Sequence, residues 1–133
     1  MNRRGMTLLI VLVTSTLISL SVTLLISSVN TEVMIAGNNL RIAHAKISAA
    51  SGLNHFAALN LTYDTLRERA GDVQTLQIIP ETQLGQRTSY EVNVHFSPSL
   101  SDGRYFVESI GYYKKSGRVI SVHPIKALFQ GEQ

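Results

Sequence analysis

Residues 6–31 read MTLLIVLVTSTLISLSVTLLISSVNT, and this stretch decides the architecture of the chain. It holds 26 consecutive residues without an ionisable side chain, and 15 of them are Met, Leu, Ile or Val. A helix of this length rises about 39 Å at about 1.5 Å per residue, which is enough to cross a hydrocarbon core of roughly 30 Å. Its Ser and Thr hydroxyls can bond back to helix carbonyls and allow close helix approach. The stretch therefore predicts a membrane-spanning helix that packs against other helices.

The charges around the apolar stretch predict its orientation. Arg3 and Arg4 precede it, and the next basic residue is Arg41. A secretory signal peptide also starts with basic residues, but its apolar part is about 7–15 residues long and is followed by a small-residue cleavage site. The stretch here is longer, and no such site follows it. We therefore expect a retained helix with a cytoplasmic amino end and the remainder of the chain outside the membrane.

Length and composition limit the rest of the chain to one small domain. The sequence has 133 residues, 12 Lys and Arg, 9 Asp and Glu, and no Cys. The absence of Cys excludes disulfide bonds and thiol chemistry. Removal of Arg3 and Arg4 would leave 10 basic against 9 acidic residues, so the net charge favours a near-neutral domain and gives little support for nucleic-acid binding.

Residues 32–71 are expected to form an amphipathic helix and a short helical turn. The first helix is expected to run to about residue 61, with a kink or local melting at Gly37-Asn38-Asn39, because Gly and Asn are poor helix formers. A second turn is expected over 64–70, with Asp64 as its cap and Gly71 at its end. One stripe of the long helix is expected to face the core, at steps of three and four residues: Val33, Ala36, Leu40, Ala43, Ile47, Ala50, Ala57 and Leu61.

Residues 72–133 are expected to form an antiparallel sheet. Residues 89–96 alternate polar and apolar side chains, which is typical of a half-buried strand. Three further strands are expected over 73–79 (stopped by Pro80), 104–113 and 118–129, with a tight turn at 114–117. Pro124 indicates that the last strand is an edge strand or contains a bulge.

Such a sheet has one apolar face, and the amphipathic half of the long helix is available to cover it. The expected fold is therefore α+β, one long helix packed on about four antiparallel strands. The expected segments are a leader (1–5), a transmembrane half of the helix (6–31), an amphipathic region (32–71) and the sheet (72–133).

These features together resemble type IV pilin-like proteins. The short basic leader MNRRG is followed by an apolar helix and a small sheet, so the resemblance implies cleavage by prepilin peptidase after Gly5 and N-methylation of Met6. Phe is commoner than Met at that place in the family. The stretches EVMIAGN (32–38) and AASGL (49–53) are similar to PilX-type minor pilins more narrowly, which implies an assembly role for Gly37 and Asn38. The resemblance covers most of the first 60 residues.

One departure from the major-pilin pattern concerns Ile10. The family usually has Glu at the fifth residue after cleavage, and that carboxylate is thought to meet the positive N-terminus of a neighbouring subunit. A buried unpaired charge costs several kcal/mol, so the pairing directs subunit addition. Ile10 cannot make it, which implies a priming subunit at the filament tip with no subunit above it. The alternative is simple drift to an apolar residue.

Candidate chemistry elsewhere is sparse. His44 and His55 lie on nearly the same helical face but about 16 Å apart, too far to share a metal, and His95 is expected to face solvent. No metal, cofactor or catalytic pattern is present, so we expect a protein that is not an enzyme. Lys114, Lys115 and Arg118 cluster at a hairpin tip beside tyrosines; a solubility role or a subunit contact is favoured over nucleic-acid binding.

The resemblance therefore predicts a non-enzymatic minor pilin that resides in the bacterial inner membrane and later at the extracellular pilus tip. Implied partners are other minor pilins, the major pilin, the inner-membrane assembly platform and prepilin peptidase. Two alternatives stay open. One is a minor pseudopilin of a type II secretion or competence system, although the K-type member usually carries a helical insertion that this chain has no room for. The other is a single-span membrane protein with a small sensor or ligand-binding domain.

Overall fold

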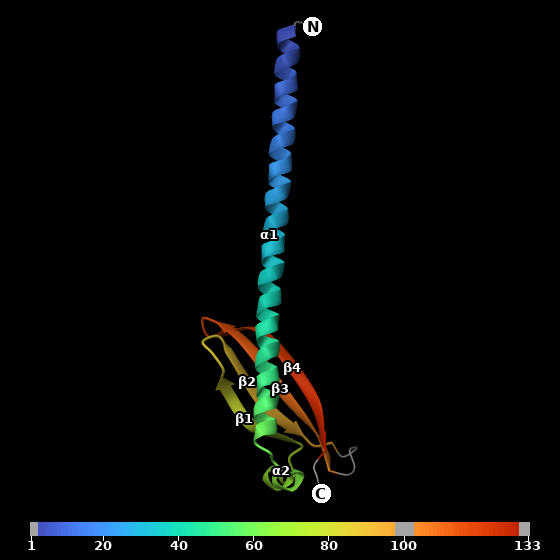
Figure 1. Ribbon diagram of the computed structural model, residues 1–133, viewed down its shortest axis with the longest axis vertical. Helices are drawn as coiled ribbons and strands as arrows, with labels where there is room; N and C mark the ends of the chain where they lie inside the picture. Colours follow the sequence, from blue (N-terminus) through green and yellow to red (C-terminus); the bar gives the residue numbers. More distant parts are fainter. Residues whose placement is uncertain (1–2, 98–102, 131–133) are drawn as a thin grey trace. The chain divides into compact units, whose positions relative to one another are not determined.

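The computed structural model describes residues 3–97 and 103–130, with side chains from residue 5 onward. The described residues form two helices, α1 (Arg3–Ala58) and α2 (Tyr63–Ala70), and four strands. The strands are β1 (Thr75–Gln83), β2 (Thr88–His95), β3 (Arg104–Lys115) and β4 (Arg118–Gln130). They form one antiparallel sheet in the order β1-β2-β3-β4 (Figure 1). The predicted α+β architecture, a long helix packed on four antiparallel strands, is confirmed.

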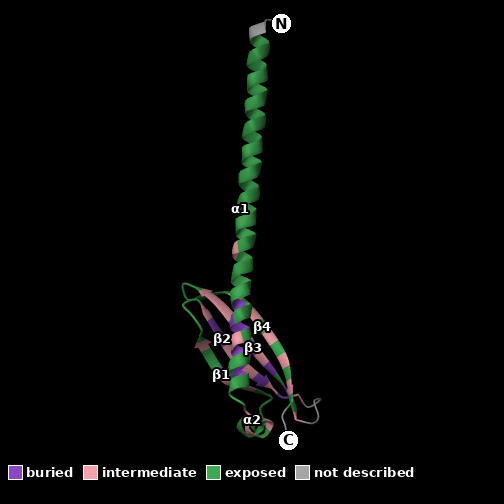
Figure 2. Ribbon diagram, in the orientation of Figure 1, coloured by how far each residue is buried: buried purple, intermediate pink, exposed green. Residues whose placement is uncertain are grey.

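The chain divides into two compact units, residues 1–38 and 39–133, and α1 contributes to both. In the first unit the described side chains are exposed, apart from half-buried Gly37. Figure 2 shows this part of α1 almost wholly in the exposed colour. Gly37, Asn38 and Asn39 are themselves helical, so the local melting expected at these residues does not occur. The unit boundary nevertheless falls between Asn38 and Asn39.

The face of α1 that covers the sheet is not the predicted one. Of the eight residues in the expected stripe, seven are exposed and Leu61 is half-buried. The buried positions follow the same spacing but are mostly small: Ala45, Ser48, Ala49, Gly52 and Phe56. The prediction ranked faces by hydrophobicity, whereas the close approach of helix and sheet selects the face with the smallest side chains.

Two glycines permit that close approach. A Cβ atom on Gly111 of β3 would overlap the carbonyl oxygen of Ala45 and the backbone nitrogen of Ala49. A Cβ atom on Gly52 of α1 would overlap the hydroxyl of Ser109. Helix backbone and strand backbone are therefore in direct contact at Gly111, which leaves no space for a large apolar stripe between them.

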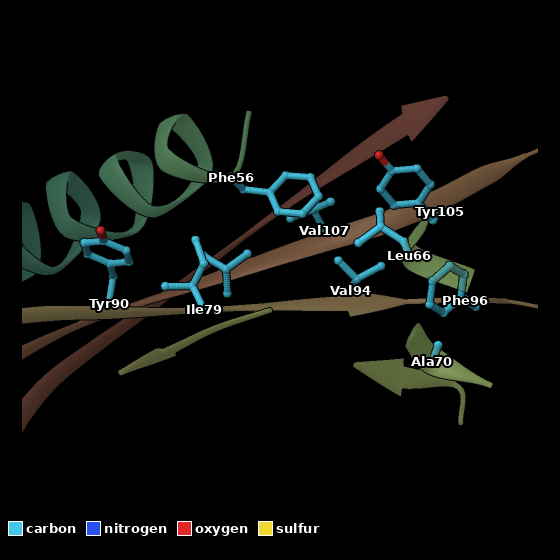
Figure 3. Close-up of a cluster of buried hydrophobic side chains, with 10 residues drawn as sticks. Phe56, Leu66, Ala70, Ile79, Tyr90, Val94, Phe96, Tyr105 and Val107 are labelled. Carbon is cyan, nitrogen blue, oxygen red and sulfur yellow. The ribbon is translucent and has the colours of Figure 1, made fainter. Parts of the chain in front are cut away.

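Aromatic rings fill the end of the core where α1 ends and α2 begins, and Figure 3 shows Phe56, Phe96 and Tyr105 among them. Phe56 of α1 packs edge-on against Phe129 at 5.4 Å between centroids, and Tyr105 stacks on Phe129 at 5.9 Å. Tyr63 of α2 packs against Tyr105 and Phe96, each at 6.0 Å. The rings therefore join both helices to β2, β3 and β4. From β2 and the residue that follows it, Tyr90, Val92, Val94 and Phe96 enter the core as the alternation predicted.

The helix boundaries differ from the prediction at the connection between α1 and α2. The first helix ends at Ala58 rather than near residue 61, and Asn60 adopts a positive φ of 45°. Asn tolerates this left-handed conformation better than most residues. Thr62, not Asp64, caps α2 by accepting a hydrogen bond from the Thr65 backbone, and Gly71 ends the helix as predicted.

The strand prediction was wrong at Pro80. We expected a strand over 73–79 that stops at this proline, but β1 starts at Thr75 and continues through it to Gln83. β1 is an edge strand, and its register with β2 shifts between Ile79 and Thr82. Proline fits an edge strand with a bulge because its missing N–H then costs no ladder hydrogen bond. The edge position predicted from Pro124 is confirmed, since β4 is the opposite edge.

The predicted turn at 114–117 is shorter than expected. Lys114 and Lys115 belong to β3, and Lys115 pairs with Arg118 at the start of β4. Only Ser116 and Gly117 form the turn, with φ values of 52° and 77°. Two consecutive positive φ angles match the right-handed twist of a tight hairpin.

Candidate functional site

The first candidate site is the apolar part of α1, which carries the expected processing and assembly residues. Gly5, Met6 and Ile10 are exposed helical residues in the first unit, and a Cβ built on Gly5 would meet nothing within 4 Å beyond its chain neighbours and the adjoining helix backbone. An 18-residue window of this helix has a mean hydropathy of 2.5. By length and composition, α1 is able to cross a membrane.

Six hydroxyl groups in this part of the helix bond to carbonyl oxygens of the helix itself. Thr14, Thr16 and Ser21 donate to the carbonyl oxygens of Ile10, Val13 and Leu17 at 2.8–2.9 Å. Further donors of the same kind are Ser15, Thr23 and Thr31. Hydrocarbon offers no partner for a free hydroxyl, so these bonds make the polar side chains compatible with lipid or with an apolar helix bundle. The predicted back-bonding is confirmed for these residues.

Gly37 and Asn38, the other expected assembly residues, lie on α1 beside the unit boundary. A Cβ built on Gly37 would have no neighbour within 4 Å, and Asn38 is exposed. Neither position is required by packing among the described residues, so their assembly role stays a prediction.

The three residues of the predicted basic cluster at the hairpin tip lie in two different environments. Lys114 is half-buried, forms an ion pair with Glu81 of β1 and lies over the ring of Tyr112 at 5.9 Å. Lys115 and Arg118 are exposed and face each other beside the turn. Two cations at the tip are therefore available to a partner, which is a smaller positive surface than the sequence indicated.

Glu81 is the centre of this arrangement. It also accepts a hydrogen bond of 2.6 Å from the buried hydroxyl of Ser89. The hydrogen bond from Lys114, followed by that from Ser89, holds the pKa of the Glu81 carboxyl below its ordinary value. Nearby, Tyr112 donates to Glu91 at 2.8 Å. Burial, reinforced by that acidic partner, raises the pKa of Tyr112, so its hydroxyl stays protonated and continues to donate.

A second polar network crosses all four strands on the face of the sheet that α1 does not cover. Thr75 of β1 bonds to Nδ1 of His95 at 3.0 Å, and Nε2 of His95 contacts Glu108 of β3 at 2.9 Å. The other oxygen of Glu108 lies 3.3 Å from the ammonium of Lys126 on β4. The network therefore connects both edges of the sheet through side chains on neighbouring strands.

The order hydroxyl, imidazole, carboxylate in this network is also the order of a nucleophilic triad. The arrangement here lies on an open sheet face. Thr75, His95 and Glu108 line neither the cavity beside the end of α1 nor the small one beside Glu81. No cluster of His, Asp and Glu able to hold a metal occurs in the described residues. The geometry therefore favours a structural role for this network, in which the side chains link neighbouring strands.

Sequence reasoning missed this network. His95 was expected to face solvent, but it is half-buried and bonded on both ring nitrogens. Its position on the polar side of β2 was visible in the alternation. Its partners were not, because the pairing of His95 with Phe106 and Thr75 is a matter of register.

The two histidines of α1 contact the sheet instead of forming a site of their own. His44 stacks on Tyr113 with ring centroids 5.8 Å apart, and Nδ1 of His55 bonds to the hydroxyl of Tyr90 at 2.8 Å. Each contact joins a polar side chain of the helix to a tyrosine of the sheet. His44 and His55 therefore help to hold α1 against the strands.

The open sheet face also carries apolar side chains. Phe106, Val122 and Leu128 are 37–54% exposed, and they lie on β3 and β4 in rows that alternate with Glu108 and Lys126. A face of this composition is about as apolar as a non-obligate protein interface and as the rest of a protein surface.

The class of molecule that these observations define is a small α+β domain continuous with a helix that is able to enter a membrane. Beyond this class, no protein-family profile, characterised protein or solved structure matches the chain.

Proposed function

We propose that this chain is a minor subunit of a type IV pilus, of the PilX type, which primes filament assembly and sits at the tip with other minor pilins. In this proposal it is not an enzyme. The observation that supports it most is the division of α1. The first half is apolar and exposed, with six of its hydroxyls bonded to helix carbonyls, and the second half is packed on a four-stranded sheet. A helix so divided suits storage in the inner membrane followed by transfer into a filament of packed helices.

The assembly step follows from the apolar surface of α1. In the membrane, lipid covers side chains such as Leu9, Val13 and Leu24, all of which are exposed in the isolated chain. In a filament, the helices of the major pilin and of other minor pilins would cover the same side chains. Extraction by the assembly platform then exchanges one apolar environment for another, so it exposes little apolar surface to water.

Ile10 determines the position of the subunit in the filament. Because it has no carboxylate, it cannot neutralise the amine of a subunit above it, and such an amine would be left unpaired in an apolar core. A subunit with this property is tolerated at the end of the filament. The open face of the sheet, with Phe106, Val122 and Leu128, would meet the neighbouring tip subunits.

The mature N-terminus is the primary test. Mass spectrometry of the full chain, recovered from cells that contain prepilin peptidase, should find residues 1–5 removed and Met6 N-methylated. A Gly5→Leu variant is the matched control, because a bulky residue before the cleavage site should leave Met1 and the leader in place. An intact Met1 in the wild-type chain would overturn the proposal and favour a single-span membrane protein with a sensor domain.

Location and charge are tested together by immunogold labelling of sheared filaments. The wild-type chain should label filament ends, whereas Ile10→Glu should reduce piliation or spread the label along the shaft. If Ile10→Glu left both unchanged, the explanation from charge would fail. Labelled structures that depend on a secretion system instead of a pilus would place the chain among the pseudopilins.

A further inference from the structure

A cavity of about 420 Å³ lies beside the carboxyl end of α1, within the second unit. Its lining includes the aromatic residues Phe56, Tyr105 and Phe129, here called the floor, and the polar residues Asn60, Thr62 and Gln130, here called the rim. Pockets that hold small ligands are commonly about 300–1,000 Å³ and combine an apolar floor with a few converging polar groups. This cavity has both properties.

The floor is preformed. Phe56 and Tyr105 are each 3% exposed, and both pack on Phe129 with centroid distances of 5.4 and 5.9 Å. Figure 3 shows the rings of Phe56 and Tyr105 held among Val107 and Leu66 of the core. Rings locked in this way lose little freedom when a ligand contacts them, which keeps the entropic cost of binding low.

The rim is held in place by the ends of two helices. Asn60 has a φ of 45°, and its backbone N–H donates to the carbonyl of Ala57 in the last turn of α1. Thr62, two residues on, caps α2. Gln130 approaches from the end of β4. The lining therefore includes two amide residues, Asn60 and Gln130, and an amide side chain has both donors and acceptors.

The lining also sets the charge of the ligand. Among the described residues that line the cavity there is no Lys, Arg, Asp, Glu or His, so a charged ligand would lose water without gaining a counter-charge. Burial raises the pKa of Tyr105, which keeps this phenol neutral. A wholly apolar ligand would strip water from the amides of Asn60 and Gln130 and leave them unpaired.

We propose that this cavity is a binding site for a neutral saccharide of one or two rings. The hydroxyls of such a ligand each donate and accept hydrogen bonds, which matches the amide groups of Asn60 and Gln130. The C–H face of a sugar ring is apolar and would pack on the half-buried side chains of Phe129 and Leu61, because Phe56 and Tyr105 are already covered. The site is independent of the assembly role of α1, so either proposal can fail without the other.

The test is saturation-transfer NMR on the full chain in a zwitterionic detergent without a sugar headgroup. The probes are methyl glucoside, N-acetylglucosamine and lactose, with sialic acid as a charged comparator and indole as an apolar one. Saturation transfer to at least one neutral saccharide, stronger than to either comparator, is expected. Transfer to none of the three, or preferential transfer to sialic acid or indole, would overturn the proposal.

Two variants assign the signal to the cavity. Asn60→Gly keeps the left-handed backbone while removing the amide, and Gln130→Ala changes an exposed residue at a strand end, so both should fold. Each should weaken binding about tenfold through one lost hydrogen bond. Gln83→Ala, an exposed glutamine at the end of β1, should leave binding unchanged. Equal binding by wild type, Asn60→Gly and Gln130→Ala would also overturn the proposal.

Discussion

Gly111 of β3 lies directly against the backbone of α1 at Ala45, with no room for a side chain between them. This contact sets the distance between helix and sheet in the second unit. It also explains why the buried face of α1 carries Ala45, Ser48 and Ala49 while Leu40 and Ile47 remain exposed.

Gly111→Ala should lower the free energy of unfolding by about 1–3 kcal/mol, because the added methyl group forces the helix away from the sheet. Denaturant unfolding of the full chain in detergent measures the change. Gly37→Ala is the control, since its added Cβ would meet no atom within 4 Å beyond the adjoining helix backbone, and Ala is the better helix former; it should not destabilise. Equal stability of wild type and Gly111→Ala would contradict the close contact.

The pair His95 and Glu108 should show energetic coupling. In a double-mutant cycle with His95→Gln and Glu108→Gln, we expect a coupling free energy of about 0.5–1 kcal/mol, since the two side chains are cross-strand neighbours in a half-buried network. A cycle with Lys126→Met and Glu108→Gln should give a smaller value, because the Lys126 side chain is 63% exposed and water screens its charge. A coupling free energy that is larger for Lys126 and Glu108 than for His95 and Glu108 would contradict this prediction.

Protonation of Glu81 in acid should lower the stability of the folded protein. The hydrogen bond from Lys114 lowers the pKa of this carboxyl below its ordinary value of 4.5, so the folded state favours the ionised form. Its contribution is therefore fully present above pH 4.5 and is lost as the pH falls through the lowered pKa. Thermal unfolding from pH 7 to pH 3 should show a shallower decline for Glu81→Gln than for wild type. Added salt should reduce the difference because the carboxyl is exposed. An identical pH profile for both proteins would exclude the ion pair as a source of acid sensitivity.

Ile18→Arg should reduce membrane insertion of the full chain. A basic residue at the centre of a spanning helix costs about 2.5–3.5 kcal/mol on insertion scales. Carbonate extraction of membranes, followed by immunodetection of the chain, measures the retained fraction. Ser21→Ala is the matched control, because it removes a hydroxyl that bonds only to the helix itself and should leave retention unchanged. Full retention of Ile18→Arg would argue against a transmembrane position for α1.

Much of the fold was predictable because local patterns report it well. The alternation around Tyr90, Val92 and Val94 identified β2 and its buried face, and Gly71 marked the end of α2. Pro80 misled, since proline stops an interior strand but is tolerated on a bulged edge, and edge position is a property of the whole sheet. The stripe on α1 misled for a similar reason, because hydrophobicity alone does not report how closely a partner backbone approaches.

The candidate sites also differ in whether local sequence patterns could reveal them. Residues 6–31 indicate a helix able to cross a membrane from composition alone, because length and the absence of charge are sufficient for that inference. The network of Thr75, His95 and Glu108 joins residues 13 to 33 positions apart, and strand register decides whether they meet. The cavity likewise brings Asn60 together with Phe129 and Gln130, although Asn60 is far from the other two residues in the sequence. By itself the sequence determined an apolar helix followed by a small α+β domain, because periodicity and charge act locally. Only the tertiary structure decided which face of α1 is buried and which side chains meet, because both depend on the distance and register between segments remote in the chain.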